Sequence, residues 1–319
     1  MTRTGLAIGC GGTLGHAWSV QALATVQDAL GWDARDAEVI IGTSAGAEIA
    51  VALGAGVPVW ELLDSLYGST DVRPELLAHR AARVRRLPPR PSPRLPATGL
   101  VRAGLRRRSV CTAVAGLLPS GRDDASWLRS FGDSLADDSS WVAHPNLWLV
   151  AVDAASGDRV PFGAPGSPPA RLGDALAASW AIPGWFPPVP IGGRRYVDGG
   201  AVSSVSADLL APLGLDRVVV IAPMTSATPV PGRGAERIER LLRRQMTTGL
   251  DREIARLRAT GVTVRRIEPG PDELAAMGPN LMDARRRART LAASRVALPD
   301  RVAAALAPST TTSTRRGPS

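Results

Sequence analysis

The sequence predicts an α/β protein in which helices cover a mostly parallel, doubly wound sheet. Short aliphatic and β-branched runs, of the kind that form buried parallel strands, alternate with longer segments whose apolar residues recur every three or four positions. This alternation is typical of strands that are connected through helices packed on the sheet. A chain of 319 residues, 45% of them hydrophobic, can hold one large domain of this type or two average ones. The single alternating series favours one.

The expected strands and helices follow one another along most of the chain. Each strand is a short apolar run, and each helix has one apolar face. Strands are expected at residues 5–10, 39–41, 147–152, 217–221 and 262–264. Helices are expected at residues 16–30, 45–53, 201–213, 236–258 and 281–306.

One stretch, at about residues 73–108, departs from this pattern. It carries eleven arginines against a single acidic residue, Glu75, and includes a Pro-rich run. Such a segment is expected to lie over a core as an insertion or lid. The final residues, 308–319, are rich in Thr, Ser, Pro and Arg and are expected to be disordered. We therefore predict one domain over residues 1–307, with a basic insertion, followed by a disordered tail.

The net charge of +9 comes from arginine alone, because the chain contains no lysine. This charge permits attraction to the phosphates of nucleic acid or of an anionic lipid surface, and a GC-rich genome that writes Arg for Lys would produce the same excess. The basic stretch has no aromatic side chain on which bases could stack. We expect no nucleic-acid partner and predict that the stretch docks the protein peripherally on anionic membranes.

Cysteine content and hydropathy bear on the compartment. Two cysteines, Cys10 and Cys111, are too few for a disulfide framework and suggest a reducing environment. No run approaches the roughly 18 apolar residues of a transmembrane helix, and the apolar run before Cys10 is too short for a lipoprotein signal peptide. We expect a cytoplasmic protein, with peripheral attachment to a membrane as a further option.

A serine between two glycines is the sharpest chemical signal. Gly42 to Gly46 reads G-T-S-A-G, directly between an expected strand that ends at Ile41 and an expected helix. In a nucleophile elbow, a tight turn at this junction raises the serine above the sheet edge, and the flanking glycines relieve crowding. The helix N-terminus favours negative charge on a substrate. We expect Ser44 to be a nucleophile, with an ordinary N-cap serine as the alternative.

A second glycine-rich turn, from Gly9 to Gly15, also lies between an expected strand and an expected helix. Its sequence, G-C-G-G-T-L-G, would expose backbone N–H groups and allow an anion to approach closely. A dinucleotide-binding turn is the alternative. However, the spacing departs from G-x-G-x-x-G, and no acidic ribose-binding residue follows at the usual distance. We interpret the turn as an oxyanion loop that serves Ser44.

A serine nucleophile needs a base, and the three histidines are poorly placed for that role. In α/β-hydrolases the base comes late in the chain, whereas no histidine follows His144, and His16 and His79 come earlier still. Each is expected to be a surface or packing residue. A carboxylate within hydrogen-bond reach of the serine can act instead. Asp198, in Y-V-D-G-G at the end of a strand, is the candidate, although D-G-G alone is also an ordinary turn.

In combination, these motifs resemble those of the patatin-like phospholipases. That family carries a Gly-rich oxyanion loop, then a G-x-S-x-G elbow, and a D-G-G far downstream. Residues 178–188, A-S-W-A-I-P-G-W-F-P-P, resemble the family's A-S-x-A-x-P-x-x-F-P-P segment, and Val152 to Gly157 resemble its D-x-x-x-G strand and turn. The resemblance covers Gly5 to about Ile221, without most of the basic insertion.

The resemblance implies a three-layer α/β/α fold and a Ser–Asp dyad that hydrolyses lipid acyl esters. Carried over to this chain, Ser44 is the nucleophile and Asp198 the base. The amides of Gly11, Gly12 and Thr13 form the oxyanion hole. The resemblance implies neither a metal ion nor a cofactor.

We therefore predict a serine acyl hydrolase, of phospholipase A or lysophospholipase type, that cleaves lipid or other acyl esters through an acyl-enzyme. One departure motivates an alternative. The family loop reads G-G-x-R-G or G-G-x-K-G, whereas this chain has Leu14 in place of the cation. A catalytically weak family member that acts by binding lipid or another partner is thus the second hypothesis. A nucleotide-dependent oxidoreductase is the third, and the loop spacing disfavours it.

Overall fold

Five adjacent strands run parallel in one sheet of the computed structural model, which describes residues 2–82, 85–90, 97–107, 109–228 and 234–307. The order of the sheet is β5-β6-β3-β2-β1-β7-β8, and β4 also pairs with β3. β4 and β6 are antiparallel to β3, and β5 is antiparallel to β6. The strands are β1 (Thr4–Ile8), β2 (Val39–Thr43), β3 (Leu147–Asp153), β4 (Arg159–Phe162), β5 (Val189–Ile191), β6 (Arg194–Asp198), β7 (Arg217–Ile221) and β8 (Thr263–Ile267).

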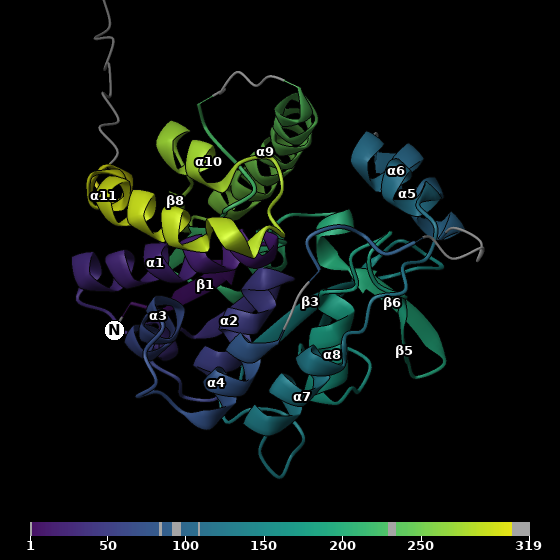
Figure 1. Cartoon of the computed structure of the whole chain (residues 1–319), viewed down its shortest axis with the longest axis horizontal. Helices are drawn as coiled ribbons and strands as arrows, with labels where there is room; N and C mark the ends of the chain where they lie inside the picture. Colours follow the sequence, from purple (N-terminus) through teal and green to yellow (C-terminus); the bar gives the residue numbers. More distant parts are fainter. Residues whose placement is uncertain (1, 83–84, 91–96, 108, 229–233, 308–319) are drawn as a thin grey trace, which may run out of the picture.

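Helices cover both faces of this sheet, as Figure 1 shows. The α-helices of the described residues are α1 (Gly12–Leu30), α2 (Ala45–Gly54), α3 (Val59–Tyr67), α4 (Pro74–Ala81), α5 (Thr98–Arg107), α6 (Val110–Leu117), α7 (Ser126–Leu135), α8 (Leu172–Ser179), α9 (Ala235–Ala259), α10 (Pro271–Met277) and α11 (Arg287–Leu306). The five parallel strands correspond to the five that the sequence predicts.

Alternate residues of each strand pack into separate apolar cores. Leu6 and Ile8 of β1 face the core that α1, α2, α8 and α11 complete, whereas Ala7 faces the core that α9 completes. Such a division is expected for a sheet that is buried on both faces. The architecture is therefore a single three-layer α/β/α domain, which confirms the predicted fold class.

Two predicted helices are shorter than expected. Over residues 201–213 the structure has a 3₁₀ helix, η3 (Ala207–Leu213), because Ser206 adopts a left-handed conformation, with φ 61°, that a continuous helix does not allow. The helix predicted over residues 281–306 begins at Arg287, after a 3₁₀ turn.

The basic stretch at residues 73–108 contains helices among its described residues. α4 packs against α7 and buries Leu76 in the main core, so this part belongs to the body of the domain. α5 packs with α6 as a hairpin at the edge of the domain (Figure 1). The predicted tail at 308–319 lies outside the described residues. Within the described part of the chain, no helix is both long enough and apolar enough to cross a membrane.

One edge of β3 is shared by two strands, and this arrangement positions the candidate site. β2 pairs in parallel with β3 up to the pair Thr43–Val150, and β6 pairs antiparallel from the pair Asp198–Ala151 onward. β4 pairs with β3 residues that also pair with β2 or with β6, so β4 must lie along the opposite edge of β3. β2 and β6 thus run toward each other, and their carboxyl ends meet. Because Ser44 follows Thr43, this register places Ser44 beside Asp198.

Candidate active site

Ser44 lies at the turn from β2 into α2 in a strained backbone conformation. Its φ of 55° and ψ of −120° fall in a region that residues with a side chain rarely adopt. A Cβ atom on Gly42 would lie 2.5 Å from the carbonyl oxygen of Gly46, and a Cβ atom on Gly46 would overlap the carbonyl oxygen of Ile8. Both predicted elbow glycines are therefore needed, because a side chain at either position would push α2 away from the sheet.

A hydroxyl group from the A-S-x-A-x-P segment holds this turn. The N–H of Ser44 donates to Oγ of Ser179 at 2.9 Å, and that hydroxyl donates to the carbonyl oxygen of Val150 at 2.7 Å. Val150 is the β3 residue at which the pairing with β2 ends. Ser44 occupies the N-cap position of α2, but its side chain makes no capping hydrogen bond. The alternative role of Ser44 as an ordinary N-cap is therefore disfavoured.

Asp198 ends β6 and is buried, with an exposed fraction of 4%. Its N–H donates to the carbonyl oxygen of Ala181 at 3.0 Å, and its Oδ1 accepts the N–H of Gly200 at 2.6 Å. The Ser44 hydroxyl is close enough to this carboxylate to act on its pKa. Burial raises the pKa of Asp198 to about 7, although the Ser44 hydroxyl and the N–H of Gly200 act to lower it. A carboxylate with this pKa can both accept and return a proton near neutral pH.

The Gly-rich loop connects β1 to α1, which begins at Gly12. The N–H groups of Gly9 and Cys10 donate to carbonyl oxygens of the surrounding fold. Those of Gly11, Gly12 and Thr13 have no acceptor among the residues that the structure describes. N–H groups at the start of a helix lack intrahelical acceptors and favour a nearby negative charge. The loop therefore offers the donors that an oxyanion hole requires.

Leu14, which stands where the family loop has a cation, is fully buried in the main core. A cation supports the loop from another element. Arg243 of α9 is buried, contacts Glu239 at 2.6 Å, and donates to the carbonyl oxygen of Pro223 at 2.6 Å. The ring of Pro223 lies against the loop, since a Cβ atom on Gly11 would be 2.9 Å from its Cγ. Arg243 thus holds Pro223 by a hydrogen bond, and the ring of Pro223 packs against the loop.

The buried free thiol of Cys10 lies among the charges of the site. Burial raises the pKa of this thiol, the negative charge of Asp198 raises it further, and Arg243 acts to lower it. Asp198 and Arg243 are therefore both within electrostatic reach of the loop. The Cys10 thiol stays protonated at neutral pH.

Two of the histidines surround a buried carboxylate that the sequence analysis did not single out. Oε2 of Glu48, on α2, lies 2.6 Å from Nε2 of His79 and 3.6 Å from Nδ1 of His16. The three side chains line a small cavity of about 70 Å³. Burial lowers the pKa of His16 to about 4, so this histidine is neutral at pH 7. The available signal was that Glu48 is the one charged residue of an otherwise apolar helix.

The structure thus brings together a strained serine, a buried carboxylate and a loop with unpaired amides, all at one end of the sheet. In the described residues, no group of three or more His, Cys, Asp or Glu side chains is arranged to hold a metal ion. The fold and the site together define the class of α/β proteins that carry a serine at a strand–helix elbow.

Comparison with known families assigns the chain more closely. The sequence model of the family described as "Patatin-like phospholipase" matches residues 6–211. This match spans more than half of the chain, so the protein belongs to the patatin-like phospholipase family, a family of lipid acyl hydrolases.

Other comparisons add little. No curated protein matches the chain significantly. Among solved structures, the chain is similar to "Crystal structure of VipD from Legionella pneumophila", with 12% sequence identity and a TM-score of 0.43. The alignment covers 95% of this chain and 67% of that one. A likeness at this level supports no argument about activity.

The strain at Ser44 leads to a stability prediction. Ser44→Gly should raise the free energy of unfolding by about 1–3 kcal/mol relative to Ser44→Ala, because glycine adopts this conformation without strain. Urea denaturation measures the difference. Ser130, an exposed residue in the middle of α7, is the matched control, and there Gly should be less stable than Ala by about 1 kcal/mol. Equal stability of the two Ser44 variants would show that the turn is unstrained.

Proposed function

We propose that the protein is a serine acyl hydrolase that cleaves lipid acyl esters through a Ser44–Asp198 dyad. The observation that supports this proposal best is the register of the sheet, which brings Ser44, directly after β2, beside the buried Asp198 carboxylate at the end of β6. A serine hydroxyl becomes nucleophilic when a base accepts its proton, and a carboxylate whose pKa is near 7 is suited to that task.

The proposed reaction has two steps. Ionised Asp198 accepts the hydroxyl proton while Oγ of Ser44 attacks the ester carbonyl carbon, and N–H groups of Gly11 and Gly12 stabilise the negative oxygen that forms. The C–O bond to the alcohol then breaks, and Asp198 returns the proton to the leaving oxygen. In the second step Asp198 accepts a proton from a water molecule while the water oxygen attacks the acyl carbon. The bond between that carbon and Oγ of Ser44 then breaks, Asp198 returns the proton to Oγ, and the fatty acid leaves.

We include Arg243 in this proposal as a positioning residue. Leu14 leaves the loop without its usual cation and so favours the alternative of a catalytically weak lipid-binding protein. The support of the loop by Arg243 through Pro223, together with the electrostatic reach of Arg243 to Cys10, favours an active enzyme. The guanidinium group would hold the loop amides in place and favour negative charge beside them.

The dyad predicts matched losses of activity. Ser44→Ala and Asp198→Asn should each lower kcat for p-nitrophenyl butyrate by about a thousandfold or more, and the double variant should be scarcely worse than either single variant. Labelling by a fluorophosphonate probe should be lost in Ser44→Ala. A folded Asp198→Asn variant with near-normal turnover would require another base.

The pKa of Asp198 predicts opposite pH trends for activity and stability. Activity requires the ionised carboxylate, so kcat/KM should rise with pH and reach half of its maximum near pH 7. Between pH 3.8 and about pH 7, the Asp198 carboxyl group is protonated in the folded protein but ionised in the unfolded chain. Protonated Asp198 therefore contributes its full stabilisation below about pH 4, and this contribution is lost as the pH rises through 7. Asp198→Asn should therefore be more stable, relative to the wild type, at pH 8 than at pH 4. Thermal unfolding at both pH values measures this difference, and a constant difference would contradict the raised pKa.

The role of Arg243 predicts an effect on kcat rather than on KM. Glu239 also pairs with Arg240 at 2.8 Å, so Arg243→Gln leaves no buried charge without a partner and is the informative variant. We expect kcat to fall on the order of tenfold, with KM little changed, whereas Arg243→Lys should retain most of the activity. A folded Arg243→Gln variant with the wild-type kcat would remove Arg243 from the mechanism.

The docking of the basic stretch, residues 73–108, on anionic membranes remains a prediction from the sequence. Some of its arginines already have partners within the protein: Arg73 pairs with Glu61 at 3.0 Å, and Arg86 lies 3.1 Å from Asp283. These contacts leave fewer arginines for a lipid surface than the sequence suggests.

A further inference from the structure

A cavity of about 570 Å³ lies between α6, α9 and the turn that follows β6. One face of α9 forms its longest wall, with residues spaced three or four positions apart: Leu241, Arg244, Gln245, Thr248, Arg252 and Arg256. The N–H of Cys111, at the start of α6, donates to Oε1 of Gln245 at 3.1 Å and so joins the opposite wall to α9. Pockets of roughly 300–1,000 Å³ are typical of sites for small ligands.

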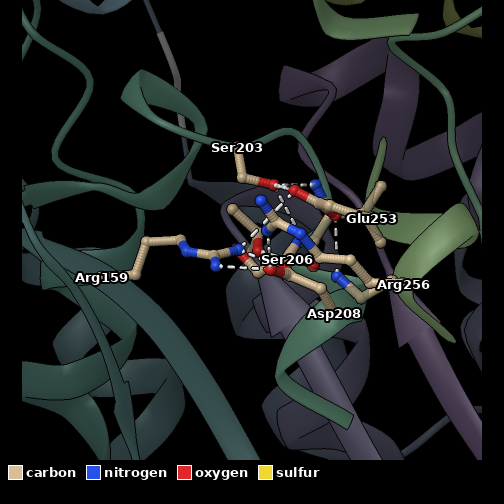
Figure 2. Close-up of polar contacts among 9 residues, drawn as sticks. Arg159, Ser203, Ser206, Asp208, Glu253 and Arg256 are labelled. Carbon is tan, nitrogen blue, oxygen red and sulfur yellow. Dashed lines mark hydrogen bonds and ion pairs between the residues drawn. The ribbon is translucent and has the colours of Figure 1, made fainter. Parts of the chain in front are cut away.

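The floor of this cavity is a network of charged side chains that are hydrogen-bonded to one another. Arg159 donates to both oxygens of Asp208, at 2.7 and 2.9 Å, and Arg256 adds a third hydrogen bond at 2.8 Å. Glu253 accepts the hydroxyl of Ser203 and lies beside Arg159, as Figure 2 shows. Since the carboxylate oxygens already have donors, the floor offers no ready ligands to a cation.

The walls hold donors that this network leaves unused. Arg244 and Arg252 line the cavity, are exposed to solvent, and have no acidic partner among the described residues. The cavity therefore presents positive charge to a ligand.

The cavity adjoins the candidate active site through Gly200, which contributes to its lining. A Cβ atom on Gly200 would lie 3.0 Å from Oδ1 of Asp198 and 3.0 Å from Sγ of Cys10. Leu241 of α9 lines the cavity and is largely exposed, which makes this side of the rim apolar. A charged interior next to a reactive carboxylate, with a rim that is apolar on one side, matches an amphiphilic ester that carries an anionic group.

We propose that this cavity binds the phosphate-bearing head group of the lipid ester, with Arg244 and Arg252 holding phosphate oxygens. The inference rests on the proposed function, because it concerns the substrate of the same site. Guanidinium groups bind phosphate through short, charge-assisted hydrogen bonds. The cavity would thereby select anionic phospholipids over neutral acylglycerols and direct one ester group toward Ser44.

The test compares two esters in micelles of a nonionic detergent, dioctanoyl phosphatidylglycerol and dioctanoylglycerol. The wild type should prefer phosphatidylglycerol. In Arg244→Gln/Arg252→Gln, the ratio of kcat/KM for phosphatidylglycerol to kcat/KM for dioctanoylglycerol should fall at least about tenfold, mainly through KM for the anionic lipid. Arg258→Gln/Arg295→Gln, which removes the same charge from exposed positions outside the cavity, should keep the wild-type ratio.

A binding measurement separates this inference from the proposed function. Ser44→Ala should bind short-chain phosphatidylglycerol in calorimetry, and Ser44→Ala/Arg244→Gln/Arg252→Gln should not. Such binding would support the head-group assignment even if the wild type hydrolysed no ester. Absence of hydrolysis would contradict only the proposed catalysis by the dyad. An unchanged ratio in an enzyme that cleaves p-nitrophenyl butyrate would overturn the cavity and leave the dyad standing. Inorganic phosphate that binds as tightly as the lipid would mark a free-phosphate site and overturn the head-group assignment.

Discussion

The candidate site depends on the change of partner along one edge of β3. Up to Val150 that edge pairs with β2, and from Ala151 it pairs with β6, which runs in the opposite direction. Two strands that meet end to end leave backbone groups without a ladder partner, and an unpaired buried carbonyl is costly. Ser179 meets this need at Val150, and the absence of a side chain at Gly199 allows the close approach, since a Cβ atom there would lie 2.6 Å from the Val150 carbonyl oxygen.

Several features of the site are unfavourable by themselves and persist because the surrounding core is rigid. The Ser44 turn is strained, Asp198 is buried with only partial compensation, and the charges of the Arg243–Glu239 pair are almost fully buried. The neighbouring helix α2 is buried along its whole length, so the elbow has little freedom to relax. Rigid packing therefore sustains a geometry that the local chain would not choose.

Much of the fold could be predicted because parallel strands that are buried on both faces appear in the sequence as continuous apolar runs. The elbow and the D-G-G turn were also visible, since each depends on glycines within a few residues of the functional side chain. β5 escaped prediction because it is only three residues long and contains Pro190, and β4 because its burial is partial. The link from Arg243 to the loop joins elements that lie more than two hundred residues apart, and no local pattern predicts such a contact.

The environment of Cys10 has a consequence for the chemistry that the site tolerates. Thiols react with oxidants and electrophiles as thiolates, and here both burial and the adjacent carboxylate disfavour the thiolate. The residue is therefore protected from alkylation and from conversion to sulfenic acid, even though it lies beside the loop. The number of cysteines is often used to infer the redox state of a protein's surroundings. Because the Cys10 thiol is unreactive, oxidation at this residue should not make the candidate site sensitive to that redox state.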